Sequence, residues 1–116
     1  MWGLDLELIE TWVASFDEDS RGQVFAAIEV LGDYGPHLGR PLVDTVTASR
    51  HKNMKKLRPG SAGKSELRIL FAFDPDRQAI MLIAGDKSDN WTRWYKRNIP
   101  LADDLFDGHL RKLRGT

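Results

Sequence analysis

Residues 66–84 limit the fold more than any other stretch, because their pattern is that of a β-hairpin. Along residues 66–73 the side chains alternate between two largely apolar faces. One face carries Leu67, Ile69, Phe71 and Phe73, and the other carries Arg68, Leu70 and Ala72. The next four residues place Pro75 at the second position of a tight turn, and residues 78–84 supply an apolar returning strand. We therefore expect an antiparallel strand pair at the centre of the fold.

Two helices are expected before this hairpin. Apolar residues recur at helical spacing in a first short helix, namely Leu8, Ile9, Trp12, Val13 and Phe16. Ser20 and Gln23 then form a capping-box pair. This pair predicts a second helix that begins at Ser20 and ends near Gly35.

A third helix and two further strands complete the expected fold. Asp89 or Asn90 can cap a helix after the hairpin, and Pro100 starts or kinks its last segment. A short strand near residues 4–6 and a basic strand at residues 51–58 precede the hairpin. The order β-α-α-β-β-β-α predicts an α+β fold, in which a helical hairpin and a C-terminal helix pack on a small, mainly antiparallel sheet. The length suits one domain over residues 1–116.

Charges are unevenly distributed along this chain, whose formal net charge is zero. Residues 1–36 hold eight acids and one base, whereas residues 50–68 hold seven Lys and Arg residues and one acid, Glu66. The seven bases are Arg50, Lys52, Lys55, Lys56, Arg58, Lys64 and Arg68. Apolar residues such as Met54 and Leu57 lie between them and would hold the segment against a core. A fixed row of cations on a sheet predicts a phosphate site, and we expect RNA phosphate.

Several other kinds of chemistry find no support in the sequence. The chain has no Cys, which excludes disulfides, thiolate nucleophiles and Cys-based zinc sites. The His residues show no metal-ligand spacing, so we expect no metal and no cofactor. His51 and His109 lack a nearby partner pattern, and we expect them in a loop and on a helix surface, respectively. No apolar run is long enough to span a bilayer, and a cytoplasmic protein without membrane contact is expected.

Five separated motifs resemble the phage Gp49-like branch of RelE/HigB-type toxins. They are GRPLVD at 39–44, SRHKNMKKLRP at 49–59, LRILFAFDP at 67–75, GDK at 85–87 and WYKRNIP at 94–100. The resemblance covers most of the chain and implies a single RelE-like domain. It also implies the toxin of a type II toxin–antitoxin pair, which cleaves mRNA on the ribosome without a metal. The implied partners are the ribosome, its mRNA and an antitoxin, commonly a helix-turn-helix protein of the Xre type.

The resemblance further implies a catalytic set of four residues. Arg68 matches the basic residue at the start of the central strand, and Lys87 matches the lysine at the end of the next strand. Lys56 is one of the cations of the preceding strand, whose register the sequence leaves open. Tyr95 lies near a C-terminal Tyr or His of some relatives. The residues expected to bind RNA are Lys52, Lys55, Arg58, Lys64 and Trp91.

Cleavage without a metal requires the ribose 2′-hydroxyl to attack the adjacent phosphate. The planar fork of Arg68 can hold two phosphate oxygens as negative charge develops on them. Lys56 or Lys87 can serve as the base, because neighbouring cations lower the pKa of a lysine. Trp91 can stack on an unpaired base. If Tyr95 faces the core, the acid and base roles pass to lysines.

Plainer interpretations of the same residues stay open. Lys56 and Arg58 can bind phosphate without taking part in chemistry, and Arg68 can pair with Glu66. Trp91 can belong to a buried helix face. Two other functions are compatible with the scaffold: a gyrase-inhibiting toxin like the ParE relatives, or a non-catalytic module that binds nucleic acid or an acidic peptide. By analogy, a hydrophobic groove beside the helical hairpin or the C-terminal helix is expected to receive an antitoxin segment.

Overall fold

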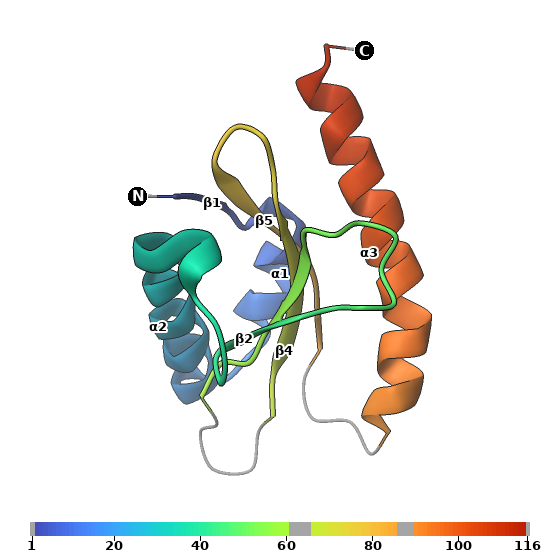
Figure 1. The fold of residues 1–116 in the computed structure, drawn as a ribbon. Helices are drawn as coiled ribbons and strands as arrows, with labels where there is room; N and C mark the ends of the chain where they lie inside the picture. The colour runs from blue at the N-terminus through green and yellow to red at the C-terminus, as the bar shows by residue number, and fades with distance from the viewer. Residues whose placement is uncertain (1, 61–65, 86–89, 116) are drawn as a thin grey trace.

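A five-stranded mixed sheet lies at the centre of the protein (Figure 1). The computed structural model describes residues 2–60, 66–85 and 90–115. The strands are β1 (Gly3–Asp5), β2 (Val43–Thr45), β3 (Met54–Leu57), β4 (Arg68–Phe73) and β5 (Gln78–Gly85), in the spatial order β1-β5-β4-β3-β2. The pairs β2–β3, β3–β4 and β4–β5 are antiparallel, whereas β1 pairs with β5 in parallel. The predicted α+β fold with a mainly antiparallel sheet is confirmed.

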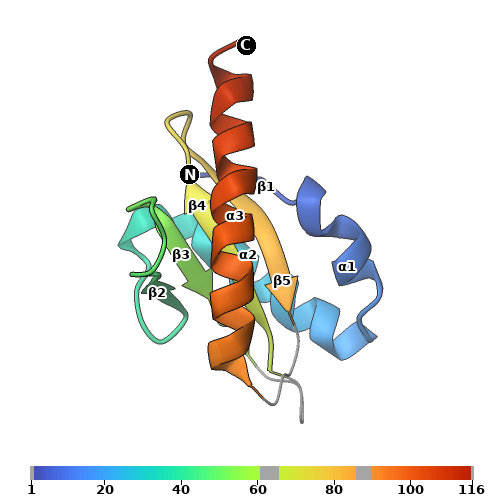
Figure 2. The same ribbon diagram turned by 90° about the vertical axis from the view of Figure 1, so that its right-hand side faces the viewer.

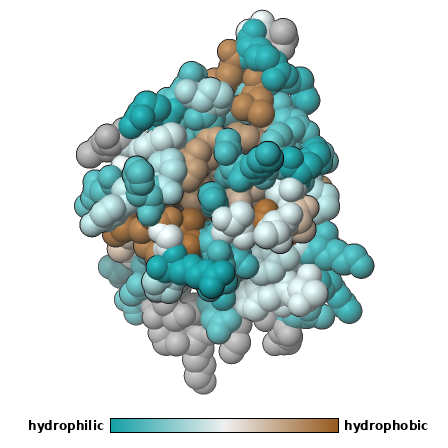
Figure 3. Space-filling model, viewed as in Figure 1, coloured by the Kyte–Doolittle hydropathy of each residue, from teal (hydrophilic) through white to brown (hydrophobic). Residues whose placement is uncertain are grey.

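The helices cover opposite faces of this sheet (Figures 1 and 2). A 3₁₀ turn, η1 (Glu7–Ile9), leads into α1 (Glu10–Ala14), and α2 (Glu18–Tyr34) runs into a second turn, η2 (Gly35–His37). These four elements lie on one side of the sheet, and the long α3 (Trp91–Leu113) lies on the other. Hydrophilic side chains dominate the view in Figure 3, with hydrophobic residues visible in separate areas. The two apolar cores lie between the sheet and its helices.

Alternation along β4 divides the interior into two cores. Ile69, Phe71 and Phe73 pack with α1 and α2, whereas Leu70 and Ala72 pack with α3. This is the predicted division of faces, because successive side chains of a strand point to opposite sides. The same rule acts on β3, where Met54 belongs to the α3 core and Leu57 to the α1/α2 core. Neighbouring cations of β3 must therefore also point to opposite sides.

The predicted β4–β5 hairpin is confirmed, and its turn is built around Asp74. The Asp74 Oδ1 atom accepts the backbone N–H groups of Asp76 and Gln78, each at 2.9 Å. Its Oδ2 atom lies 2.8 Å from His109 Nε2, a partner that no pattern near His109 in the sequence indicated. Arg77 adopts φ = 62°, a left-handed conformation that completes the turn.

Several predicted boundaries are corrected by the structure. Helix α2 begins at Glu18, because Asp17 rather than Ser20 caps it and accepts the Ser20 N–H at 2.7 Å. A fourth antiparallel strand, β2, occurs in the predicted connector, where Val43 pairs with Leu57. The basic strand covers residues 54–57 rather than 51–58. Pro100 lies inside one continuous helix, α3, and does not start a new one.

Candidate active site

Cationic side chains from two neighbouring strands meet on the α3 face of the sheet. Lys56 lies in β3, Arg58 follows the end of β3, and Arg68 begins β4. Because Leu57 pairs with Ile69, the antiparallel register places Arg58 beside Arg68. Lys56 points to the same side as Arg58, since they are two residues apart. We call Lys56, Arg58 and Arg68 the cationic cluster.

Two aromatic side chains from the start of α3 cover this cluster. The Asn90 side chain caps the helix by accepting the backbone N–H of its third residue at 2.9 Å, so that α3 begins beside the ends of β3 and β4. Lys56 Nζ lies 4.8 Å from the centre of the Tyr95 ring. The Arg68 guanidinium lies 4.9 Å from the centre of the Trp91 ring. The structure thus brings together three of the four predicted catalytic residues, through cation–π contacts.

Trp91 also contacts the segment that leads into β4, through its indole nitrogen. Trp91 Nε1 donates a 3.1 Å hydrogen bond to Glu66 Oε2. Glu66 therefore orients the Trp91 ring that contacts Arg68. This arrangement differs from the alternative in which Glu66 pairs with Arg68 directly. Arg68 donates one further hydrogen bond, of 2.8 Å, to the backbone oxygen of Leu67. Most of the five N–H donors of Arg68 thus remain for an incoming anion.

The environment shifts the pKa values of Lys56 and Tyr95 in opposite directions. The pKa of Lys56 lies below its usual 10.5, mainly because of burial and then because of the positive charge of Arg58. Burial raises the pKa of Tyr95 above 10.0, although the charges of Arg68 and Arg58 act against this shift. At neutral pH the Tyr95 phenol is therefore protonated, and Lys56 loses its proton more readily than an exposed lysine.

Two polar atoms beside the cluster are buried without a hydrogen-bond partner in the described part of the chain. They are Arg58 Nε and the hydroxyl oxygen of Tyr95. Buried polar atoms are nearly always hydrogen-bonded in folded proteins, because an unpaired one has lost its water without compensation. An unpaired buried polar atom in a native structure calls for an explanation such as a catalytic role or a bound water or ion, and two of them occur here beside the cationic cluster.

An acidic residue that the sequence reasoning missed lies beside the cluster. Asp44 of β2 pairs in register with Lys56, and its Oδ2 atom lies 3.8 Å from an Arg58 amino group and 3.3 Å from Arg40 Nε. The pKa of Asp44 is lowered, first by a hydrogen bond from the Thr45 backbone N–H. The only signal for Asp44 was its place in the GRPLVD motif, because β2 is too short to be predicted from its pattern.

The other predicted RNA-binding residues are distributed more widely. Lys55 points to the α1/α2 side of the sheet, where its Nζ donates a 3.0 Å hydrogen bond to Thr45 Oγ1. Lys52 is exposed in the loop that precedes β3, at the opposite end of this strand from Arg58. Lys64 and Lys87 lie outside the described residues. Among the predicted binding residues that the structure describes, Arg58 and Trp91 are the ones at the cluster.

A polar strap fastens the β2–β3 loop to α3. Ser49 Oγ donates a 2.5 Å hydrogen bond to Asp103 Oδ1, and the Arg50 backbone N–H donates to Asp103 Oδ2 at 3.2 Å. His51 Nε2 lies 2.6 Å from Asp107 Oδ1, a partner that no pattern near His51 in the sequence indicated. These contacts join residues more than fifty positions apart, and we call residues 49–51 the strap. The strap fixes the position of the loop relative to α3.

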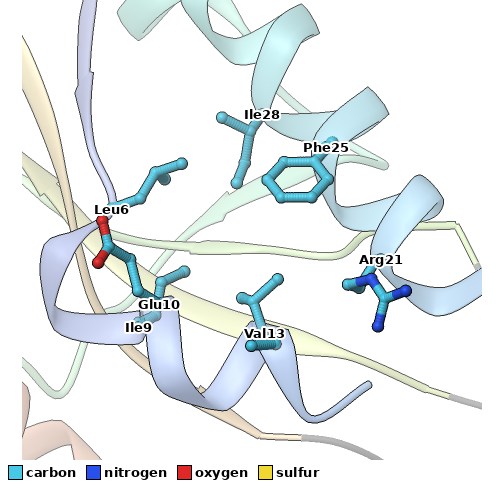
Figure 4. Close-up of a pocket in the computed structure, with 8 residues that line it drawn as sticks. Leu6, Ile9, Glu10, Val13, Arg21, Phe25 and Ile28 are labelled. Atoms are coloured by element: carbon cyan, nitrogen blue, oxygen red, sulfur yellow. The ribbon is translucent and has the colours of Figure 1, made fainter. Parts of the chain in front are cut away.

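An apolar groove lies on the opposite face of the sheet, between α1 and α2 (Figure 4). Its volume is ≈ 210 Å³, and apolar side chains such as Val13 and Ile28 point into it. Phe25 forms part of its wall and is 49% exposed. Two charged residues, Glu10 and Arg21, also line it. We call this feature the hairpin groove.

Two further observations concern the described ranges alone. Their His, Asp and Glu side chains form no group of three or more that could hold a metal ion. None of their helices combines the length and the apolar character that crossing a bilayer requires.

Comparison with known proteins finds a consistent set of relatives. The profile of the family described as phage-derived protein Gp49-like matches residues 11–107. The Mycobacterium tuberculosis H37Rv protein named "Putative toxin HigB2" is 58% identical over 115 residues, which are 99% of this chain and 57% of that protein. "Putative toxin HigB3" from the same organism is 50% identical over 110 residues, 95% of this chain and 94% of that protein. The chain thus spans little more than half of the first relative and nearly all of the second.

Proposed function

Because this chain belongs to the Gp49-like family of phage-derived proteins, we propose that it is the toxin of a type II toxin–antitoxin pair, acting as a ribosome-dependent endoribonuclease on mRNA. The family match confirms the predicted resemblance to the Gp49-like branch of HigB-type toxins. One observation supports the nuclease activity above all others. Lys56, Arg58, Arg68 and Tyr95 converge on one face of the sheet, and two of them carry buried polar atoms without partners.

The two arginines are proposed to bind the scissile phosphate. Arg58 and Arg68 lie side by side, and each can offer a pair of N–H donors to phosphate oxygens. When the 2′-oxygen attacks, negative charge grows on these oxygens, and fixed cations stabilise it without having to reorganise. Trp91 holds the Arg68 guanidinium in place, so that this donor is oriented before the RNA arrives.

Lys56 and Tyr95 are proposed to move the protons. Neutral Lys56 takes the proton of the 2′-hydroxyl as the bond from the 2′-oxygen to phosphorus forms. Protonated Tyr95, whose hydroxyl is buried in this structure and would have to become accessible when RNA binds, gives its proton to the 5′-oxygen as the bond from phosphorus to that oxygen breaks; if it stays buried, the acid role passes to a lysine. The products are a 2′,3′-cyclic phosphate and a free 5′-hydroxyl. The lowered pKa of Lys56 and the raised pKa of Tyr95 suit these two roles. Lys87 remains a predicted participant.

The ribosome and an antitoxin are the proposed partners. The cluster contains few groups, so a ribosome that holds the mRNA strand in position would contribute much of the rate. We place a segment of the antitoxin, a helix-turn-helix protein of the Xre type, in the hairpin groove. The groove is apolar, and the surrounding residues 1–36 hold eight acids and one base. This combination suits an amphipathic segment whose apolar stripe is flanked by Lys or Arg.

Mapping of RNA ends tests the proposed activity. Induction of the protein in cells should stop growth and produce new 5′-hydroxyl ends within translated mRNA, whereas the Arg68→Ala variant should lose at least about 100-fold of this cleavage. Arg114→Ala, at the far end of α3, is the matched control and should cleave normally. Growth arrest with intact translated mRNA would refute the proposal. If purified gyrase were then inhibited in a supercoiling assay, the ParE-like alternative would be supported.

A further inference from the structure

A second groove lies near β1, between η1 and the second half of α3. Its volume is ≈ 400 Å³, which is larger than that of the hairpin groove. Its lining includes Leu8 of η1 and, from α3, Asp104, Leu105, Gly108, Arg111 and Lys112. We call it the edge groove. We propose that α3 of a second copy of this protein lies in the edge groove, antiparallel to the first α3, so that two copies form a symmetric dimer. This inference is independent of the function proposed above.

Large apolar side chains are exposed along the edge groove. Leu8 is 51% exposed and Leu105 is 38% exposed, and both line the groove. Leu101, which is 50% exposed, lies one helical turn before Leu105 on α3. In both ribbon views the last turns of α3 project beyond the strands of the sheet (Figures 1 and 2). A single copy therefore leaves an apolar stripe of α3 in water, and a second apolar surface that covered this stripe would be stabilising.

Gly108 allows another helix to approach α3 closely. A glycine inside a helix is destabilising relative to alanine, so its presence in the middle of α3 needs a reason. Among the described residues, the nearest atom to a Cβ added at Gly108 is Arg111 Nη2, at 3.7 Å, which is an ordinary contact. Packing within one copy therefore does not require glycine at this position. A second helix that crosses α3 at Gly108 would give the glycine a role, because the two backbones could then come close together.

The charges on this face of α3 complement each other when two copies pair in antiparallel orientation. Asp104, Gly108 and Lys112 are spaced four residues apart, so they lie on one face of the helix. A twofold axis at Gly108 places Asp104 of one copy beside Lys112 of the other, with Arg111 adjacent, and the symmetry forms the same contact a second time. A partner with charges of a single sign would meet like charge at one end of the groove. A second copy of the chain matches both ends.

Analytical ultracentrifugation of the purified protein over a concentration series measures this self-association. The wild-type protein should pass from monomer to dimer as the concentration rises. Leu105→Glu places a carboxylate in the apolar part of the contact and should weaken dimerisation at least about tenfold. Leu113→Glu is the matched control and should dimerise normally, because Leu113 is 40% exposed on the same helix but is not among the residues that line the edge groove.

Three results of this experiment would overturn the proposal. One is a wild-type protein that stays monomeric at every concentration. Another is equal self-association of Leu105→Glu and Leu113→Glu. The third is a monomeric protein whose affinity for the antitoxin falls in Leu105→Glu, which would assign the edge groove to the antitoxin instead.

Two glycine substitutions test the crossing point separately. Gly108→Leu keeps space for its side chain within one copy but separates the two helices, so dimerisation should weaken at least about tenfold. Gly22→Leu makes the same change at an exposed position of α2, where no described atom lies within 4 Å of an added Cβ, and should leave dimerisation unchanged. Both variants replace a helix glycine, so a general effect on helix stability would appear in each of them. Equal self-association of the two variants would show that the helices do not cross at Gly108 and would overturn the proposed dimer.

Discussion

The Lys56 amine lies 4.8 Å from the centre of the Tyr95 ring, so the proposed base and the proposed acid are in contact. A cation over an aromatic ring is stabilised, and this contact favours the charged form of Lys56. Burial and the charge of Arg58 act in the opposite direction and dominate, because the pKa of Lys56 is lowered overall. The protonation states of Lys56 and Tyr95 therefore depend on the same few neighbours. Substitution of Lys56 or Tyr95 should change the cleavage rate or the stability in ways that can be measured.

Replacing Lys56 tests the predicted pH dependence of cleavage. If neutral Lys56 is the base, the rate should rise with pH through its lowered pKa and level off before the usual 10.5. Lys56→Arg keeps the charge but cannot lose its proton, so the rise should disappear. Lys55→Arg on the opposite face of the sheet is the control and should keep the wild-type profile. The measurement is the cleavage rate in a reconstituted translation system. An unchanged profile in Lys56→Arg would exclude this residue as the base.

The same lowered pKa predicts how folding stability varies with pH. Between the lowered pKa in the folded state and the usual 10.5, the unfolded chain binds a proton at Lys56 that the folded chain does not. The contribution of Lys56 to the free energy of unfolding therefore increases with pH in this window. Lys56→Gln should remove this increase, as measured by urea unfolding at a series of pH values.

Tyr95→Phe separates proton transfer from packing. The phenylalanine keeps the ring and its contact with Lys56 but lacks the hydroxyl, whose oxygen is buried without a partner in the described structure. The free energy of unfolding should change by no more than about 1 kcal/mol. Cleavage should fall about 100-fold if the phenol is the acid. Tyr34→Phe, at an exposed position of α2, is the control for loss of a hydroxyl. Normal cleavage by Tyr95→Phe would assign the acid role elsewhere.

Asp103→Asn tests the strap. Asp103 is 3% exposed and accepts hydrogen bonds from Ser49 and from the Arg50 backbone. An amide cannot accept both bonds equally well, and the variant should lose about 1 to 3 kcal/mol of unfolding free energy. Asp104 is largely exposed and contacts only the Arg50 guanidinium among the contacts described. Asp104→Asn should therefore lose less than about 1 kcal/mol in the same denaturation experiment. Equal losses of unfolding free energy in the two variants would show that the strap contributes no more to stability than an exposed ion pair.

Phe25→Glu tests the hairpin groove as the antitoxin site. The substitution places a charge at the mouth of an apolar groove within an already acidic region (Figure 4). Affinity for the antitoxin should fall at least about tenfold, because the partner's apolar side chains would meet a carboxylate. Tyr34→Glu, outside the groove lining on the same helix, should bind normally. The protein encoded by the adjacent gene is the partner to use, with binding measured by calorimetry. Unchanged affinity in Phe25→Glu would place the antitoxin elsewhere.

Local patterns in the sequence were sufficient to predict the centre of the fold. Alternation along residues 67–73 gave the correct faces of β4, because each side of that strand is buried against its own helix layer. The β4–β5 turn was also predictable, because a proline turn between two apolar runs leaves few other conformations. The cap of α2 was misplaced by three residues, since Asp17 and Ser20 both suit a helix cap and the sequence does not rank them.

The candidate site was harder to predict, because it is formed by contacts between parts of the chain that are distant in the sequence. The separation of Lys55 from Lys56 follows from the exact start of β3, which alternation cannot fix in so short and basic a strand. Asp44 became visible as a neighbour of Lys56 only through the pairing of β2 with β3. The links from His51 to Asp107 and from His109 to Asp74 join residues that no local pattern connects. Similarly, β1 pairs with β5, which lies far from it in the sequence, and no residue pattern in either strand indicates this parallel pairing.

The sheet separates the hairpin groove from the cationic cluster, since α1 and α2 cover one side and α3 covers the other (Figure 2). An inhibitor anchored in the groove would leave the cations uncovered. Under the proposed function, such an inhibitor would act by steric exclusion of the protein from the ribosome. It would not act by blocking the cationic cluster. A short peptide that contains only the anchoring segment should then bind in the hairpin groove without inhibiting the protein.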